Sequence, residues 1–268
     1  MTISVTAINI FPVKALGGIP LQNSLLTNRG LQFDRRFLVV DQNDMFLTQR
    51  DYPKMATVWV ECEGGVVTFS APDVDGVAFA ATPQPTTTRT VTVWSSQVAA
   101  QAVGTEADQW LSDFLGAVVR LVYMPEASAR LIDREYASAG DLVSFADGYP
   151  VLMASTASLD DLNARIVAEG GVALPMNRFR PNLVVSGGAA FAEAHLGIVA
   201  IGECVFRAVK PCVRCQVTTT DQASGVVMGP EPLQTLGRYR DAGKGPVFGM
   251  NLIPVKLGTV RVGDSVTF

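Results

Sequence analysis

The sequence is poor in the features that mark several large classes of protein. Only 17% of its 268 residues are charged, and the net charge of −4 at pH 7 leaves no basic excess, so a nucleic-acid-binding surface is not expected. No uncharged apolar run is long enough to cross a bilayer. The N-terminus also lacks the basic and apolar regions of a secretory signal. We therefore expect a cytoplasmic protein with no membrane partner.

Cysteine and histidine are also scarce. The sequence holds four cysteines and one histidine, which are Cys62, Cys204, Cys212, Cys215 and His195. In a reducing cytosol the cysteines are expected to be thiols. A structural zinc site needs two more Cys or His ligands at suitable spacing beside one CxxC pair, and none of the remaining residues has that spacing. His195 is expected in a surface turn without a catalytic role.

Apolar residues make up 48% of the chain, which is enough for a packed core and excludes a disordered protein. In the first hundred residues, short apolar runs separated by Gly, Pro, Asp and Asn predict strands. These runs are 3–13, 33–41, 57–62, 65–70 and 90–94. A helix is expected to begin near Thr105, and a strand at 121–124 ends this region.

A polar, irregular passage over 126–148 precedes a second β-rich region. There, a helix over 158–169 is expected from its apolar spacing and from the two glycines that follow. Strands are expected at 151–153, 182–186, 199–201, 205–209, 217–220 and 259–262. The sequence thus predicts a β-rich α+β protein with two β-rich units and a few helices.

Two cationic positions stand out against their apolar surroundings. Along an expected strand over 33–39, alternation puts Arg35 on one face with two phenylalanines and a valine. Such an arginine lies either at an exposed strand end or against an anion, and both an internal carboxylate and a bound ligand remain open. Arg180 and Asn182 share a face of their own expected strand, a donor pair that suits a planar, polar or anionic ligand.

Residues 210–221, KPCVRCQVTTTD, carry the most specific pattern. The CxxC pair allows a zinc site, a thioredoxin-like dithiol, one reactive thiolate, or two small buried hydrophobes. The Val and Thr that follow predict a strand, whereas a redox dithiol normally opens a helix. In the third interpretation, Cys215 is a thiolate beside Arg214 and Lys210. A soft thiolate is a natural ligand for a sulfur-loving metal.

Several short motifs occur in the order expected for one family. They are FPVK at 11–14, GLQFDR at 30–35, LTQR at 47–50, RFRPN at 178–182, CVRC at 212–215, TTTD at 218–221 and GD at 263–264. Together they resemble the MOSC proteins (molybdenum cofactor sulfurase C-terminal domain) that carry a MOSC N-terminal β-barrel. Within that family, the chain most resembles the mitochondrial amidoxime-reducing components and their bacterial relatives, over almost its whole length.

The resemblance implies a fold and a cofactor. The fold would be two β-barrel-like units with a few peripheral helices, a MOSC N-terminal β-barrel over 1–125 and a MOSC domain over 126–268. The cofactor would be molybdenum–pyranopterin (the molybdenum cofactor), with no pyridoxal phosphate, and Cys215 would be its metal ligand and the catalytic residue. The residues implied to hold the pterin and its phosphate are Lys14, Arg35, Gly148, Tyr149, Arg180, Asn182, Arg214 and Asn251.

The activity implied by the resemblance is reduction of N-hydroxylated or N-oxygenated small molecules, with the oxygen leaving as water. Four cysteines cannot supply a Cys₄ iron–sulfur cluster together with a molybdenum ligand. Electrons are therefore expected from a separate flavin, haem or iron–sulfur protein. The alternative is a non-catalytic carrier of the cofactor or of sulfur.

The sequence departs from the family pattern at two positions. Ala15 stands where relatives often have Ser, which removes a hydroxyl donor. Gln222 replaces a common Pro after Thr220-Asp221, which leaves the shape of that loop open.

Overall fold

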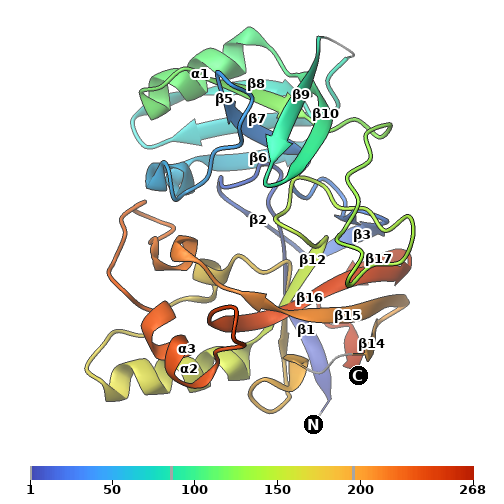
Figure 1. The fold of residues 1–268 in the computed structure, drawn as a ribbon, viewed down its shortest axis with the longest axis vertical. Coiled ribbons are helices and arrows are strands. Elements are labelled where there is room, and N and C mark those ends of the chain that lie inside the picture. Colours follow the sequence, from blue (N-terminus) through green and yellow to red (C-terminus); the bar gives the residue numbers. More distant parts are fainter. Residues whose placement is uncertain (1, 85–86, 195–196) are drawn as a thin grey trace.

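The computed structural model describes residues 2–84, 87–194 and 197–268, and His195 lies outside these ranges. The described residues form many strands and three α-helices (Figure 1). The β-rich α+β fold class predicted from the sequence is confirmed.

Seven of the eight strands of the largest sheet close into a barrel, and the eighth, β2 (Ile19–Leu21), extends from β1. The order around the barrel is β13-β12-β16-β15-β14-β18-β1, and pairing of β13 with β1 closes the ring. The barrel strands are β1 (Ile3–Ile10), β12 (Val151–Ser155), β13 (Leu183–Ser186), β14 (Gly197–Ile201), β15 (Cys204–Val213), β16 (Val247–Lys256) and β18 (Ser265–Thr267).

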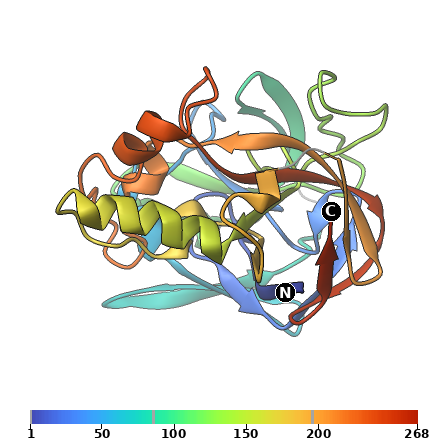
Figure 2. The same cartoon turned by 90° about the horizontal axis from the view of Figure 1, so that it is seen from below.

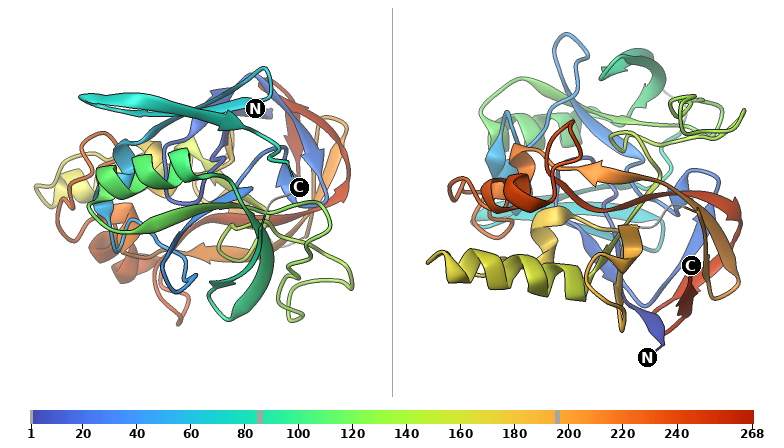
Figure 3. Two further views of the ribbon diagram at one scale, coloured as in Figure 1. Left: turned by 90° about the horizontal axis from the view of Figure 1, so that it is seen from above. Right: turned by 60° about the horizontal axis from the view of Figure 1, so that its bottom comes forward.

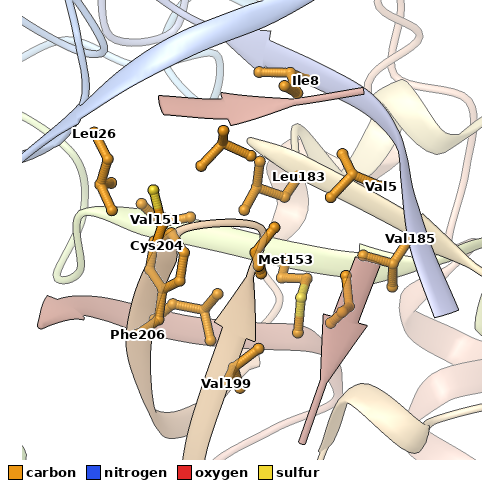
Figure 4. Close-up of a cluster of buried hydrophobic side chains, with 14 of the residues drawn as sticks. Val5, Ile8, Leu26, Val151, Met153, Leu183, Val185, Val199, Cys204 and Phe206 are labelled. Carbon is orange, nitrogen blue, oxygen red and sulfur yellow. The ribbon is translucent and has the colours of Figure 1, made fainter. Parts of the chain in front are cut away.

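Strand β1 comes from the start of the chain but lies in the barrel of the C-terminal half (Figure 1). Its apolar residues Val5, Ile8 and Ile10 point into the barrel, because an irregularity in the pairing with β13 between Val5 and Ala7 shifts the alternation of side chains by one residue. Figure 4 shows Val5 and Ile8 among the side chains of the C-terminal strands. Strand β1 is thus part of the second core, and a domain boundary after residue 125 stays a prediction.

The other half of the molecule consists of two sheets and one helix. One sheet has the order β5-β11-β10-β9, and the other has the order β6-β7-β8. Their strands are β5 (Phe37–Asp41), β6 (Trp59–Glu63), β7 (Val66–Ala71), β8 (Val74–Ala80), β9 (Thr88–Val93), β10 (Ser96–Ala102) and β11 (Val119–Tyr123). Helix α1 (Thr105–Leu115) lies across these strands (Figure 3) and buries Leu111 against them.

The ends of α1 follow from its sequence. Glu106 and Asp108 lie in the first turn, where the helix dipole favours negative charge. Gly116 ends the helix in a left-handed conformation, with φ of 69°. Asp108 also accepts a hydrogen bond from the Leu121 backbone N–H (2.7 Å), which ties the helix to β11.

A small sheet with the order β17-β3-β4 lies beside the barrel. Its strands are β3 (Asn23–Thr27), β4 (Gly30–Leu31) and β17 (Gly258–Arg261). Gly30 has φ of 104°, and a Cβ there would lie 2.3 Å from the Pro150 carbonyl oxygen. Only glycine therefore lets this strand approach the start of β12 so closely.

We expect Gly30→Ala to cost about 1–3 kcal/mol more unfolding free energy than Gly116→Ala, because the new methyl group collides with backbone. Gly116 is the matched control: its φ is also positive, but a Cβ there meets no atom within 4 Å. Urea unfolding of both variants measures the difference. Equal costs would contradict the close approach of β4 to β12.

Residues 124–150 connect the halves without a helix or strand, as predicted for 126–148. The segment still has its own small core, in which Ile132 and Val143 pack against Ile253 of the barrel. The buried Arg130 side chain stabilises the last turn of this segment by donating to the carbonyl oxygens of Ser144 (2.9 Å) and Asp147 (2.8 Å). The segment that precedes β12 is therefore held against the outside of the barrel.

Two helices of the C-terminal half lie side by side outside the barrel (Figure 2). They are α2 (Thr156–Ala168) and α3 (Leu233–Tyr239), which share an apolar cluster with Phe179 and Phe248. Four 3₁₀ helices complete the described elements: η1 (Pro53–Thr57), η2 (Met176–Phe179), η3 (Ala192–Ala194) and η4 (Gln216–Thr219).

The strand predicted at 33–41 was wrong at its start. Strand β5 begins at Phe37, and Arg35 lies in a turn with φ of 48°. Asp34 stabilises this turn, because its carboxylate accepts the Phe11 backbone N–H (2.8 Å) and the Arg35 side chain. Side-chain alternation therefore does not apply to Arg35.

The strand predicted at 217–220 was also wrong, since these residues belong largely to η4. Thr218 Oγ1 donates to the Cys215 carbonyl oxygen (2.9 Å), and Thr219 Oγ1 donates to the Gln216 carbonyl oxygen (2.8 Å). Such local hydrogen bonds compete with strand pairing. Likewise, Arg180 is not in a strand: it ends η2 with φ of 52°, and β13 begins at Leu183.

Candidate cofactor site

One cavity lies between the two halves of the molecule. Its volume, including the part at the mouth that is open to solvent, is about 900 Å³. This volume is within the size range of small-molecule and cofactor sites. All nine residues that the sequence predicted for the site line this cavity. They are Lys14, Arg35, Gly148, Tyr149, Arg180, Asn182, Arg214, Cys215 and Asn251.

The cavity lies outside the barrel. Leu152 and Asn251 line the cavity, whereas their chain neighbours Val151, Met250 and Leu252 belong to the barrel core. Because alternate side chains of a strand face opposite sides, β12 and β16 present one face to the core and the other to the cavity. The barrel interior is filled with apolar side chains, so it offers no room for a cofactor.

Cys215 is an exposed thiol in the wall of the cavity. It lies just after β15 and directly before η4, and Cys212 also lines the cavity. Neither of the other two cysteines lines the cavity, and burial raises the thiol pKa of both Cys62 and Cys204. Among the described residues, no three His, Cys, Asp or Glu side chains are placed to hold a metal ion. A metal at Cys215 would therefore have to arrive with its other ligands.

Arg35 has an internal carboxylate partner. Its guanidinium donates to both oxygens of Asp34 (2.9 and 2.6 Å) and to Asn182 Oδ1 (3.1 Å). Of the two partners that the sequence left open for Arg35, the internal carboxylate is therefore present, and contact of Arg35 with a cofactor stays a prediction. Because Asp34 directly precedes Arg35 and the turn brings the two side chains together, no distant partner is needed.

Asn182 lines the cavity while connecting several elements. Its Oδ1 accepts hydrogen bonds from Arg35 and from the Leu152 backbone N–H (3.1 Å), and its Nδ2 donates to the Asn9 carbonyl oxygen (3.1 Å). The Asn182 amide thus joins β1, β12 and the Arg35 turn. These hydrogen bonds indicate that Asn182 stabilises the structure of the cavity wall.

Lys14 is buried and paired with Asp147, whose side chain is 73% exposed. Lys14 also donates to the Phe145 carbonyl oxygen (3.0 Å), and Trp94 Nε1 donates to Asp147 Oδ1 (3.2 Å). Burial lowers the pKa of Lys14. The charge and hydrogen bond of Lys14 lower the pKa of Asp147 well below its usual range, although the protein around the cavity acts to raise it.

We expect Asp147→Asn to destabilise the protein by about 1–3 kcal/mol at neutral pH, because Lys14 loses its counter-charge. A carboxylate with a lowered pKa in the folded state contributes stability above its unfolded pKa and loses it as the pH falls. The difference from wild type should therefore shrink below about pH 4. Urea unfolding across pH, with exposed Asp160→Asn as the control, measures this. A difference that does not change with pH would contradict the ion pair.

Arg180 contacts only neutral oxygen atoms in the described part of the chain. Its guanidinium donates to the Leu16 carbonyl oxygen (2.6 Å) and to Gln222 Oε1 (3.1 Å), and it is 9% exposed. Burial, together with the charge of Arg35, lowers the pKa of Arg180 to about 9. An anion bound in the cavity would favour the charged form of Arg180.

Arg214 and Arg50 are two further cations in the cavity wall. Arg214 donates to Cys212 Sγ (2.9 Å) and to the Phe179 carbonyl oxygen (2.8 Å), while its buried Nε has no partner among the described residues. Arg50 Nε donates to Thr48 Oγ1 (3.3 Å), and its guanidinium lies over the Trp94 ring. With Arg180, the cavity thus has three arginines whose charges no carboxylate neutralises in the described ranges.

These features fit a molybdenum–pyranopterin cofactor. A surplus of positive charge in an acidic protein suits an anionic phosphate. The exposed Cys215 thiol in the same wall suits a soft metal. The sequence reasoning missed other lining residues, among them Asp147, Gln49 and Arg50. Gln49 and Arg50 lie in the LTQR motif, which could have indicated them, whereas no local signal marks Asp147.

The comparisons with known proteins agree with the resemblance. A model of the MOSC N-terminal beta barrel domain matches residues 2–118, and a model of the MOSC domain matches residues 141–267. Mitochondrial amidoxime-reducing component 1 of Mus musculus is 32% identical over 96% of this chain and 79% of its own length. The Homo sapiens protein of that name is 31% identical over 96% of this chain and 80% of its own length.

The chain is a MOSC protein of the amidoxime-reducing component family. The YUAD protein from Bacillus subtilis, a solved structure, aligns with 99% of this MOSC protein and 94% of its own chain, at 10% identity and a TM-score of 0.43. Within the described residues of the MOSC protein, no helix is both long and apolar enough to cross a membrane. Its two departures from the family pattern, Ala15 and Gln222, both contact Gln49.

Proposed function

We propose that this MOSC protein is a molybdenum cofactor-dependent reductase of N-hydroxylated or N-oxygenated small molecules, with electrons from a separate donor protein. The observation that carries the proposal is the shared cavity, in which an exposed thiol, Cys215, lies with arginines that no carboxylate neutralises. The names of the relatives support the substrate class, since an amidoxime is an N-hydroxylated amidine.

In this proposal the residues that line the cavity have separate roles. Cys215 Sγ would be the protein ligand of the metal, and Arg180 and Arg214 would bind the phosphate of the pterin. Reduction of an N–O bond to N–H and water takes two electrons and two protons, and a molybdenum centre can take up electrons singly and deliver them in pairs. The remaining tasks, which are binding, orientation and control of charge, belong to the protein.

Two polar groups of the wall would face a substrate or cofactor with fixed protonation. Asp147 stays a carboxylate at neutral pH because the charge and hydrogen bond of Lys14 lower its pKa. Tyr149 stays a neutral phenol because burial raises its pKa to about 12. Asp147 would accept hydrogen bonds in the cavity, and Tyr149 would donate one without releasing its proton.

Aerobic purification followed by elemental analysis and an assay tests the proposal. We expect close to one molybdenum per chain and reduction of an amidoxime with a chemical electron donor. Bound cofactor without turnover would instead favour the non-catalytic carrier of cofactor or sulfur. A protein with neither bound molybdenum nor turnover would overturn both the reductase and the carrier. The electron-donor protein and the cytoplasmic location stay predictions.

A further inference from the structure

Two glutamines, Gln49 and Gln222, join the two halves of the molecule at the cavity wall. Gln49 Nε2 donates to Gln222 Oε1 (3.1 Å), and Gln222 Nε2 donates back to Gln49 Oε1 (2.9 Å). Each amide has a second anchor: Gln49 Nε2 donates to the Ala15 carbonyl oxygen (2.7 Å), and Gln222 Nε2 donates to that of Thr220 (3.1 Å). Gln49 is 1% exposed, so its side of the pair is shielded from water, whereas Gln222 is partly exposed.

The glutamine pair also contacts the guanidinium of Arg180. Gln222 Oε1, which accepts from Gln49, also accepts from Arg180 Nη1 (3.1 Å), and the Leu16 carbonyl oxygen accepts from Nη2 (2.6 Å). The Arg180 guanidinium also lies 4.2 Å from the centre of the Phe11 ring. Arg180 is therefore held on several sides, yet each of these partners is uncharged.

The neutrality of the pair matters for binding. A glutamate at position 222 could accept the same hydrogen bond from Arg180, but it would also neutralise the guanidinium. Glutamine fixes the guanidinium and leaves its charge available to an anion in the cavity. The contrast with Arg35 is direct, because Asp34 already neutralises Arg35.

We propose that Gln49 and Gln222 form a neutral clasp that positions the uncompensated guanidinium of Arg180 for the phosphate of a bound pterin cofactor. Gln222 is thus a positioning residue, which acts through Arg180. The inference rests on the proposed function, because it takes the cofactor as the source of the phosphate. A guanidinium is suited to this task, since its planar fork matches the oxygens of a phosphate.

The test compares Gln222→Met with Gln222→Glu. Methionine removes the hydrogen bonds but adds no charge, whereas glutamate keeps an acceptor and adds a charge. We expect both molybdenum content and the affinity of the metal-free protein for inorganic phosphate to follow the order wild type, Gln222→Met, Gln222→Glu. The last variant should bind phosphate roughly tenfold or more weakly than wild type. Its free energy of unfolding should stay close to that of wild type, because the ion pair with Arg180 offsets the loss of the two hydrogen bonds that Gln222 Nε2 donates.

The control is Gln97→Glu, which adds the same charge at an exposed position of β10 that does not line the cavity. It should bind phosphate and molybdenum as wild type does. A purely structural role for Gln222 predicts the order wild type, Gln222→Glu, Gln222→Met, because methionine loses more hydrogen bonds than glutamate does. That order, or equal binding by all variants, would overturn the clasp.

The phosphate titration also separates the clasp from the proposed function. If wild type carries no molybdenum but phosphate affinity follows the expected order, the proposed function fails and the clasp stands as an anion-positioning device. If wild type binds neither the cofactor nor phosphate, the clasp is overturned as well.

Discussion

Replacing Cys215 by serine is expected to abolish reductase turnover and to leave the fold intact. The Cys215 side chain is exposed in the cavity wall, and its contacts with η4 are made by its backbone carbonyl oxygen, which accepts from Thr218. Serine therefore removes a soft metal ligand without disturbing a core. Changes beside metal ligands cost about 10–100-fold in activity, so loss of a ligand should lower kcat by more than about 100-fold.

Cys212→Ser is the matched control, because Cys212 lines the same cavity two residues from Arg214. Its effect on kcat should be far milder, and both variants should unfold in urea as wild type does. Full activity of Cys215→Ser with bound molybdenum would contradict the assignment. Comparable losses in both variants would favour a dithiol that uses the two cysteines together.

Replacing Arg180 by methionine should weaken cofactor binding but leave the free energy of unfolding nearly unchanged. A charge-assisted hydrogen bond contributes about 1.5–3 kcal/mol, so the affinity for the cofactor should fall about tenfold to a hundredfold. The free energy of unfolding should stay within about 1 kcal/mol of wild type. The reason is that methionine removes a buried charge with no anionic partner, which offsets the lost hydrogen bonds to Leu16 and Gln222.

Molybdenum content and urea unfolding, measured on the same preparations, check this prediction. Arg89→Met is the control, since Arg89 pairs with Asp44 and does not line the cavity. Its molybdenum content should equal that of wild type. If Arg180→Met lost cofactor only in proportion to a loss of stability, Arg180 would have a structural role alone.

The sequence predicted which residues line the cavity better than it predicted how their charges are paired. Lys14 and Arg214 are far apart in the chain, yet motif order alone placed both in one site, and both line the cavity. Motif order works here because each motif keeps residue types that a given ligand chemistry needs. It carries no information on which neighbour neutralises which charge.

The partner of Arg35 illustrates this limit. Alternation along a strand was the wrong physical model, because the backbone at Arg35 is left-handed and turns the side chain onto Asp34. The Lys14–Asp147 ion pair and the Gln49–Gln222 pair join residues far apart in sequence. Their pairing depends on how the two halves pack, which no local pattern reports.

The fold was predicted best where apolar periodicity decides it. Helix α1 and helix α2 lie within a few residues of their predicted ranges. The 217–220 segment failed because threonines favour strands in general but here bond to nearby backbone. Participation of β1 in the C-terminal barrel was not predicted either, since strand pairing across the chain is a tertiary property.

The central claim is that the Cys215 sulfur is bonded to molybdenum. Electron paramagnetic resonance of partly reduced protein tests it most directly, with wild type and Cys215→Ser loaded to equal molybdenum content. We predict a molybdenum signal in wild type that is lost or clearly altered in Cys215→Ser and is retained in Cys212→Ser. An identical signal in wild type and Cys215→Ser would contradict the claim.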